Sequence, residues 1–254
     1  GSGASSSIQA NINSLGANFI MIFPGTSTQG GAHFHSEQSS LTEDDAIAIK
    51  TECPSVTYVS PGLRTGGQVV AGENNWATQI FGADVDWPFI RSWNVSKGSF
   101  FTESEVKGAA KVAVLGNSVV QNLFPESDPI GAIVRVKNVP FKVIGVLEKK
   151  GGSTMGSDQD DQIVIPYTTA MKRILGNNRI GLLQVSAKSP EAIQDAMAEI
   201  AALLRQRHRI APGQDDDFMM RSQEEIAASA SETTRTLSVL LASIAVVSLV
   251  VGGI

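Results

Sequence analysis

The stretch IGLLQVSAKSPEAIQDAMAEIAALLRQRH, residues 180–208, predicts a β-strand followed directly by an α-helix. Apolar residues dominate its first eight positions, whereas after Pro190 they recur every three or four residues, the spacing of one helical face. Ser189 is a preferred N-cap residue, and Pro190 suits the first helical position, where an N–H would be unpaired anyway. The apolar stripe of this helix must face a core, and it consists of Ile193, Met197, Ile200, Leu203 and Leu204.

The same order of elements is expected twice. After the helix, DDFMMRS (216–222) is typical of a strand and completes a β-α-β unit. Near the N-terminus, ANFIMIFPG (17–25) predicts a buried strand, and SVTYVS (55–60) predicts another. Between them, LTEDDAIAIKTE (41–52) predicts a helix that Thr42 caps and that carries acidic residues in its first turn. Residues 17–60 therefore form the first β-α-β unit.

The sequence between the two units is rich in expected strands. Apolar and polar residues alternate over 132–150, which predicts two strands joined by a turn at Asn138. Further strands are expected at 66–72, 76–84, 111–116 and 162–167, and helical segments at 87–93, at 117–124 with Asn117 as its cap, and at 168–176 with Gly176 at its end. Two β-α-β units that flank a β-rich stretch predict an α+β fold with a second domain inserted into the first.

Composition excludes some classes of function. The 254 residues carry a net charge of −5, and the basic clusters are short, so nucleic acid is not an expected partner. Arg205, Arg207 and Arg209 fall near a helix end, where cations favour the helix dipole, and this explanation is preferred to a binding patch. Cys53 is the single cysteine, which excludes a disulfide framework and a cysteine-rich zinc site, and it is expected to be a buried free thiol.

Nucleotide-binding and hydrolase motifs are absent from the sequence. GTSTQGG (25–31) lacks the lysine of a P-loop, no G-x-G-x-x-G follows a strand, and GGSTMG (151–156) has the wrong spacing for a nucleophile elbow. No catalytic, cofactor-binding or metal-binding residue is therefore predicted. His33 and His35 form a pair that would need further ligands to hold a metal, and a solvated loop over 25–40 is the preferred interpretation.

Two acidic clusters and one aromatic group are expected to have structural roles rather than functional ones. The acidic clusters lack the spacing of a calcium loop, and they are expected to be solvated turns: Asp158, Asp160 and Asp161, and Asp215, Asp216 and Asp217. The aromatic group is expected to form core, although a ligand pocket is the alternative: Trp87, Phe89, Trp93, Phe100 and Phe101.

Both ends of the chain suggest helices with apolar faces. Ile8, Ile12 and Leu15 are spaced as one face of a helix that ends at Gly16. At the other end, LSVLLASIAVVSLVVGGI (237–254) contains no charge. As a helix it would be about 27 Å long, close to the roughly 30 Å of a hydrocarbon core. It is therefore predicted to begin a transmembrane helix, in which Gly252 and Gly253 allow close helix packing. A buried core helix is the alternative.

Nearly the whole chain resembles the large periplasmic domain of MacB-type ABC transporter permeases. This group also includes LolC and LolE and, more distantly, FtsX. Each matching string is generic alone, but their order along the chain is specific. The strings are INSLGANFIMIFPG, LTEDDAIAI, SVTYVSP, VAVLGNSVVQNLFPESDPIGAIVRV, PFKVIGVL, IVIPYTTAMKRILG, LLRQRH, DDFMMRS and LVVGGI. One departure lies at residues 98–100, where relatives often carry an arginine after the glycine, so a local contact there is expected to differ.

The resemblance implies a domain placed between the first two transmembrane helices of a permease in the bacterial inner membrane. Segments 17–67 and 162–221 would form a porter-like subdomain, similar to those of RND pumps, and 68–161 an inserted β-rich subdomain. Residues 1–16 and 222–236 would form a helical stalk leading to the second span at 237–254. The implied stalk and coupling residues are Ile8, Ile12, Leu15, Ile226 and Leu237.

The resemblance also implies partners and a mechanism. The permease would be a homodimer, with ATP and Mg²⁺ bound by a cytoplasmic domain absent from this chain and with membrane lipids around the C-terminal helix. The stalk would pass the motion of that domain to the periplasmic part. There a periplasmic adaptor protein and an outer-membrane channel would carry out export.

Two other functions remain open from the sequence. A lipoprotein-releasing permease of the LolC/LolE kind would grip a lipoprotein or its chaperone, and a long apolar groove would favour it. A hydrolase with an apolar C-terminal anchor is disfavoured because no nucleophile motif is present. The exported substrate does not follow from the sequence.

Overall fold

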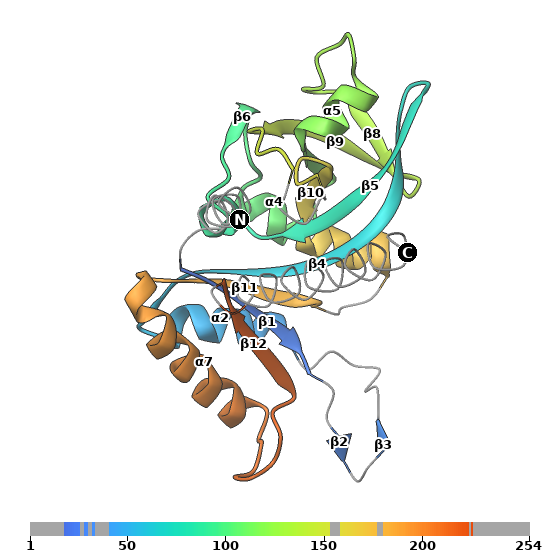
Figure 1. Ribbon diagram of the computed structural model, residues 1–254. Coiled ribbons are helices and arrows are strands. Elements are labelled where there is room, and N and C mark those ends of the chain that lie inside the picture. The colour runs from blue at the N-terminus through green and yellow to red at the C-terminus, as the bar shows by residue number, and fades with distance from the viewer. Residues whose placement is uncertain are drawn as a thin grey trace, which may run out of the picture.

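The computed structural model describes residues 18–25, 28–29, 32–33, 41–152, 158–176, 180–223 and 225. Within these ranges the chain forms two bodies, one above the other in Figure 1, and the long strand β4 (Val56–Ala71) belongs to both. The predicted stalk segment 1–16, nearly all of 222–236 and the predicted membrane segment 237–254 lie outside the described residues. Within the described ranges no helix has both the length and the apolar character needed to span a membrane.

The lower body is a four-stranded antiparallel sheet with the order β12-β1-β11-β4. Its elements follow the two predicted β-α-β units, and the second unit interleaves with the first as in a ferredoxin-like fold. They are β1 (Phe19–Pro24), α2 (Glu43–Glu52), the first half of β4, β11 (Leu182–Ala187), α7 (Ile193–Arg207) and β12 (Phe218–Ser222). A short ladder of β2 (Thr28–Gln29) and β3 (Ala32–His33) falls inside the stretch expected to be a loop.

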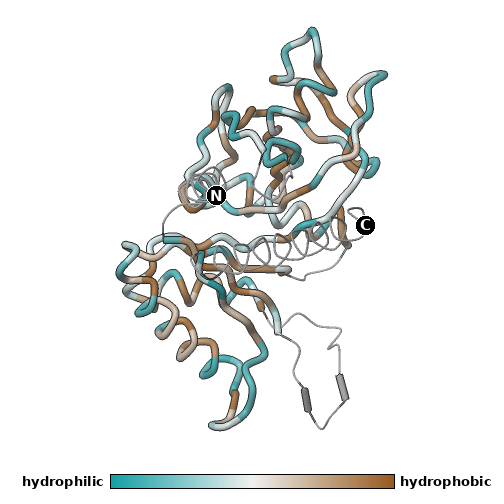
Figure 2. Tube along the Cα trace, viewed as in Figure 1, coloured by the Kyte–Doolittle hydropathy of each residue, from teal (hydrophilic) through white to brown (hydrophobic). Residues whose placement is uncertain are grey.

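Helix α7 forms where the sequence predicts it. Ser189 is the N-cap of a short 3-10 turn, η2 (Pro190–Ala192), which starts with the proline and continues into α7. The predicted stripe faces the sheet: Ile193, Ile200 and Leu204 are buried, and Met197 and Leu203 are partly buried against the same core. Figure 2 shows the resulting alternation of hydrophobic and hydrophilic residues along this helix.

Strand β4 is continuous, although two separate strands were expected at 55–60 and 66–72. It pairs with β11 as far as Gly62 and with β5 (Asn74–Ala83) from Leu63 onward. Pro61 does not break it, because the outer edge of β4 is covered by the segment after β5 rather than by another strand. There the N–H of Val59 donates to Asp86, and the N–H of Asp84 donates to the Ser60 hydroxyl. The expected boundary between 67 and 68 therefore lies inside an unbroken strand.

The upper body closes into a ring of six strands. The second half of β4 pairs with β5, and the pairing continues through β10, β7, β9 and β8 back to β4. Closure of this kind leaves no free strand edge along the ring. The added elements are α3 (Trp87–Ile90), β6 (Val95–Gly98), α4 (Glu103–Lys107), β7 (Val112–Leu115), α5 (Asn117–Leu123), β8 (Ile133–Val136), β9 (Val139–Leu147), β10 (Gln162–Pro166), α6 (Tyr167–Thr169) and the π-helical η1 (Ala170–Leu175).

Local details of the upper body follow from turn and cap chemistry. The predicted hairpin turn is confirmed, since Lys137 and Asn138 both have positive φ, as a tight turn between β8 and β9 requires. Gly176 ends η1 in the left-handed region, as predicted. The expected cap Asn117 is wrong, since Gly116 is the N-cap of α5. Glycine is needed at this position because a Cβ would lie 2.1 Å from the carbonyl oxygen of Asp160.

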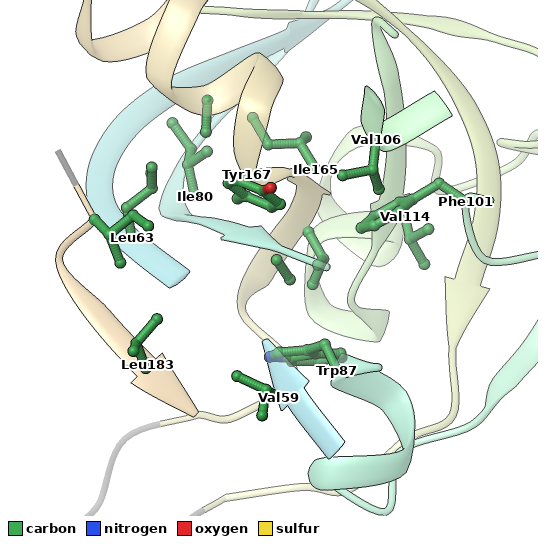
Figure 3. Close-up of a cluster of buried hydrophobic side chains, with 14 of the residues drawn as sticks. Val59, Leu63, Ile80, Trp87, Phe101, Val106, Val114, Ile165, Tyr167 and Leu183 are labelled. Carbon is green, nitrogen blue, oxygen red and sulfur yellow. The ribbon is translucent and has the colours of Figure 1, made fainter. Parts of the chain in front are cut away.

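The aromatic group forms core, with one exception. The Trp87 ring stacks on Trp93 at 5.7 Å and on Phe100 at 6.0 Å between centroids, and Trp93 and Phe101 are buried with it. Figure 3 shows Trp87 beside Val59, while Phe101 lies with Val106 and Val114. Phe89 is the exception, since its side chain is 63% exposed and stacks on Tyr58 at 5.2 Å. It was wrongly expected in the core, because a four-residue helix has both a buried and an exposed side.

Cys53 is the buried free thiol that the sequence predicts. Burial raises its pKa to about 11, and the nearby charges of Glu199 and Glu52 add to the effect. Because the thiolate is the reactive form, alkylation of the folded chain at pH 7.5 is expected to be about a hundredfold slower than alkylation of the denatured chain. Mass spectrometry after iodoacetamide treatment measures both rates. Equal rates in the two states would contradict the burial of this thiol.

Candidate functional site: the contacts of helix α2

All residues that the sequence singles out for function lie outside the described ranges. They are Ile8, Ile12, Leu15, Ile226, Leu237, Gly252 and Gly253. The structure therefore neither brings them together nor separates them, and their roles stay predictions. Within the described ranges, no group of three or more His, Cys, Asp or Glu side chains is placed to hold a metal ion. The polar contacts that tie the fold together converge instead on helix α2.

The N-terminus of α2 carries a capping box, as the N-cap expected at Thr42 implies. The Thr42 hydroxyl accepts a hydrogen bond from the N–H of Asp45 at 3.2 Å, and the Thr42 N–H donates to Asp45 Oδ2 at 2.9 Å. The hydroxyl of Thr42 also lies 2.7 Å from the same carboxylate oxygen. Asp45 is only 2% exposed, so its carboxylate depends on protein partners rather than on water.

A charged cluster joins this cap to the far end of α7. Arg207 Nε donates to Asp45 Oδ1 at 2.7 Å. His208 lies between two carboxylates, with Nε2 at 3.2 Å from Asp45 Oδ2 and Nδ1 at 2.8 Å from Asp217 Oδ1. We call Thr42, Asp45, Arg207, His208 and Asp217 the α2–α7 clamp. The first four line a depression of about 300 Å³.

Electrostatics inside the clamp favour the charged forms. Burial acts to raise the pKa of Asp45, but hydrogen bonds from Arg207, Thr42 and His208 outweigh it and hold the pKa below its ordinary value. Burial acts to lower the pKa of His208, but hydrogen bonds to Asp217 and Asp45 and their negative charges raise it above the ordinary value. Two carboxylates and two cations therefore neutralise one another across three elements of the lower body.

The acidic clusters are only in part the solvated turns that the sequence predicts, since Asp158 and Asp215 are exposed whereas Asp160, Asp161, Asp216 and Asp217 are not. Asp217 meets His208, and Asp216 accepts two hydrogen bonds from Arg205, both at 2.7 Å. In the upper body Asp160 is 1% exposed and accepts from the N–H groups of Lys150 and Gly151, both at 2.8 Å. For Asp160, Asp216 and Asp217 the prediction is wrong because each of these carboxylates is paired by a group from another segment. Of the basic residues expected to act on the helix dipole, Arg205 is a partner of the second cluster, whereas Arg207 binds Asp45.

Two further contacts connect α2 to the segments of the upper body. The hydroxyl of Tyr167, the first residue of α6, donates to Glu43 Oε1 at 2.6 Å. Burial and this hydrogen bond raise the pKa of Tyr167 far above its ordinary value, so the hydroxyl stays protonated. Near the other end of α2, Lys50 forms an ion pair with Asp86, directly before α3. Figure 3 shows Tyr167 packed among Ile80, Ile165 and neighbouring side chains of the upper body.

A fourth contact holds the C-terminal end of α2 to α7. The N–H of Ser55 donates to Glu199 Oε2 at 2.9 Å, and the Ser55 hydroxyl donates to Glu199 Oε1 at 2.7 Å. Together with the α2–α7 clamp, this pair fixes α2 against α7 near both of its ends. Helix α2 is thus bonded to α7 on one side and to the upper body on the other.

The described chain enters and leaves the lower sheet at neighbouring points. β1 and β12 are antiparallel partners, and Ile20, near the start of β1, lies opposite Ser222, the last residue of β12. The chain segments before residue 18 and after residue 225 therefore attach to adjacent positions of one sheet.

Comparison with known families agrees with the predicted resemblance. The model of the family described as the MacB-like periplasmic core domain matches residues 1–203. The chain belongs to this family. The MacB-like resemblance read from the sequence is thereby confirmed.

Curated relatives are similar over the full length of the chain. The macrolide export ATP-binding/permease protein MacB of Syntrophobacter fumaroxidans is 33% identical over 309 residues, which cover 100% of this chain and 43% of the relative. The protein of the same name from Bdellovibrio bacteriovorus is 36% identical over 256 residues, covering 100% and 39%. The chain thus spans less than half the length of these relatives.

Solved structures share the MacB-like fold. The periplasmic region of MacB from Actinobacillus actinomycetemcomitans superposes with a TM-score of 0.70 at 24% identity, over 88% of this chain and 97% of that one. The extracellular domain of the ABC-type transporter YknZ from Gram-positive bacteria gives a TM-score of 0.63 at 20% identity, over 81% and 100%. At these identities the likeness concerns the fold alone.

Proposed function

We propose that this chain is the periplasmic domain of a MacB-like ABC transporter permease and that it couples ATP hydrolysis to export. Family membership and the export and ATP-binding functions in the names of its curated relatives support the proposal. ATP and Mg²⁺ would be bound by a cytoplasmic domain outside this chain. The domain works as a rigid transmitter and performs no chemistry of its own.

The neighbouring attachment points of β1 and β12 carry this proposal. Movement of the two flanking segments, the proposed stalk, would reach one sheet through adjacent strands. From that sheet it would pass to the upper body along two routes, the shared strand β4 and helix α2 with its bonds from Glu43 and Lys50. Packed elements with a few defined contacts are suited to switching between two arrangements.

The wider assembly follows the family resemblance. The permease would be a homodimer in the bacterial inner membrane, with this domain in the periplasm and lipids around segment 237–254. Its partners would be a periplasmic adaptor protein and an outer-membrane channel. In this proposal the lower body corresponds to the porter-like subdomain predicted over 17–67 and 162–221, and the upper body to the insert predicted over 68–161. Strand β4 belongs to both bodies, and β10, α6 and η1 lie in the upper body rather than in the porter-like part. The stalk would be lined by Ile8, Ile12, Leu15, Ile226 and Leu237, and Gly252 and Gly253 would pack in the membrane.

The lipoprotein-releasing function is the alternative, and a long apolar groove would favour it. Two depressions among the described residues do not have this character. One belongs to the charged α2–α7 clamp, and the other lies at the loop of Ile210–Gln214 beside Arg205, each about 300 Å³. The names of the curated relatives also refer to macrolide export. Both observations favour the export function.

Coupling through α2 is tested by replacing Tyr167 with phenylalanine in the intact transporter. Loss of the hydroxyl removes the hydrogen bond to Glu43 and leaves the buried ring in place. We expect ATP hydrolysis to continue while the amount exported per ATP hydrolysed falls several-fold, because motion of the stalk reaches the upper body less directly. Parallel assays of ATPase activity and of drug export from cells measure this ratio.

A matched control is Glu103→Gln, which removes the exposed ion pair between Glu103 and Lys107 on α4. This variant is expected to export as the original protein does. Glu43→Gln should resemble Tyr167→Phe, since both changes weaken the same bond. An unchanged export-to-ATP ratio in both of these variants would refute transmission through α2.

A further inference from the structure

We propose that the α2–α7 clamp is a proton-operated latch. His208 must carry its second proton to bridge Asp45 and Asp217, and loss of that proton releases the start of α2 from the connection between α7 and β12. The latch is a property of this chain alone, so it goes beyond the coupling function and can be tested without transport.

The geometry at His208 requires two donors. Nδ1 lies 2.8 Å from Asp217 Oδ1, and Nε2 lies 3.2 Å from Asp45 Oδ2. A neutral imidazole has one N–H and one lone pair, and an ionised carboxylate can only accept. Both contacts are hydrogen bonds only when the ring is an imidazolium. In the neutral form one ring nitrogen would place its lone pair against a carboxylate oxygen, and that contact would be lost.

The position of His208 makes this contact matter for the fold. His208 is the C-cap residue of α7, Asp45 lies in the first turn of α2, and Asp217 directly precedes β12. The His208 side chain is 9% exposed, and its ring meets the Phe218 ring edge-on at 6.2 Å between centroids. The Asp45 side chain is 3% exposed and that of Asp217 is 31% exposed, so a hydrogen bond lost on the Asp45 side is poorly replaced by water.

Charge balance depends on the same proton. With His208 protonated, Arg207 and His208 neutralise Asp45 and Asp217. After the proton leaves, the positive charge between the two carboxylates is gone, and the nearby acids Asp44 and Glu52 of α2 add to the negative potential. Three segments carry charged groups around the clamp. They are Glu43, Asp44, Asp45 and Glu52 on α2, Arg205 and Arg207 on α7, and Arg209, Asp215, Asp216 and Asp217 on the connection to β12. Among these, Arg205 is paired with Asp216.

The latch is closed only within a window of pH. The pKa of His208 is raised from 6.5, so its contribution to stability is complete below pH 6.5 and is lost as pH rises through the raised value. The pKa of Asp45 is lowered from 3.8, so its contribution is complete above that pH and is lost on acidification through the lowered value. A rise in pH through the raised pKa of His208 opens the latch, whereas acidification opens it only through the lowered pKa of Asp45.

The test is an NMR titration of the 254-residue chain in detergent solution between pH 5.5 and 9. We expect both ring nitrogens of His208 to be protonated at pH 6 and its pKa to lie above 6.5. Across that transition the hydrogen-exchange protection factors of the Ala46 and Ile210 amides should fall about tenfold, the loss expected for one charge-assisted hydrogen bond. The amide of Ile200, in the middle of α7, is the internal reference and should not change.

Two variants separate the latch from general pH effects. His208→Gln should abolish the pH step at Ala46 and Ile210. Asp216→Asn should keep the step, because the partner of Asp216 is Arg205, which does not titrate in this range. The proposal is overturned if His208 titrates at or below pH 6.5, or if protection at Ala46 does not change while His208 loses its proton. The titration of the unmodified chain decides this even if a variant fails to fold.

Discussion

Replacing Asp45 with alanine is expected to lower the free energy of unfolding by about 3–5 kcal/mol, the range found when one partner of a buried ion pair is removed. The Asp45 carboxylate is 2% exposed and receives hydrogen bonds from Arg207 and the backbone of Thr42, and it also contacts His208. Its removal leaves the His208 ring with one carboxylate and the N-terminus of α2 without its capping box. Urea unfolding followed by circular dichroism measures the change.

The neighbouring Asp44 provides the matched control. It lies in the same first turn of α2 and carries the same charge, but it is exposed. Asp44→Ala removes the favourable interaction with the helix dipole and is expected to change stability by less than about 1 kcal/mol. If the two variants were equally stable, the α2–α7 clamp would contribute nothing beyond the helix dipole.

Trp93→Ala is expected to destabilise the chain by about 3–5 kcal/mol, the usual loss for a large aromatic residue in a core. The Trp93 ring is fully buried and stacks on Trp87, and its Nε1 donates to the carbonyl oxygen of Glu148 at 2.6 Å. Truncation leaves a cavity and an unpaired carbonyl between α3 and the end of β9. Thermal unfolding followed by near-ultraviolet circular dichroism also reports the loss of the aromatic stack.

Phe89 is the control for this second variant, since it belongs to the same aromatic segment and is mostly exposed. Phe89→Ala removes the stack on Tyr58 and is expected to lower stability by less than about 1.5 kcal/mol. A decrease in the free energy of unfolding as large as that of Trp93→Ala would show that the exposed stack stabilises the fold as much as a buried aromatic residue does.

Local patterns in the sequence were enough for most helices and strands. The stripe of α7, the cap at Thr42 and the turn at Asn138 each depend on residues within a few positions, and all three are confirmed. The continuity of β4 was missed because Pro61 and Gly62 normally end a strand. What keeps them in a strand is the covering of its outer edge by Asp84 and Asp86, a tertiary contact without a local pattern.

The contacts of the candidate site could not be predicted from local sequence patterns, because they join residues that are distant in the sequence. Asp45 was predicted only as one of the acidic residues in the first turn of its helix, and Arg207 as a cation that favours the dipole at the end of another helix. Each interpretation is physically sound for its own helix, yet the two side chains bind each other across the fold. The one indication in the sequence was the acidic segment 215–217, ten residues after Arg205, which could supply a specific partner for that arginine.

The pairing of β1 has a consequence for how the chain folds during synthesis. Both strand partners of β1 lie far along the chain, since Phe19 pairs with Ser186 and Ile20 with Ser222. The ring of the upper body, in contrast, uses only segments between β4 and β10 and can form first. During synthesis the apolar strand FIMIFP therefore waits with open edges until almost the whole domain has followed it. This apolar strand should thus favour aggregation until the domain is complete, and polar substitutions at Met21 or Phe23 should reduce that aggregation.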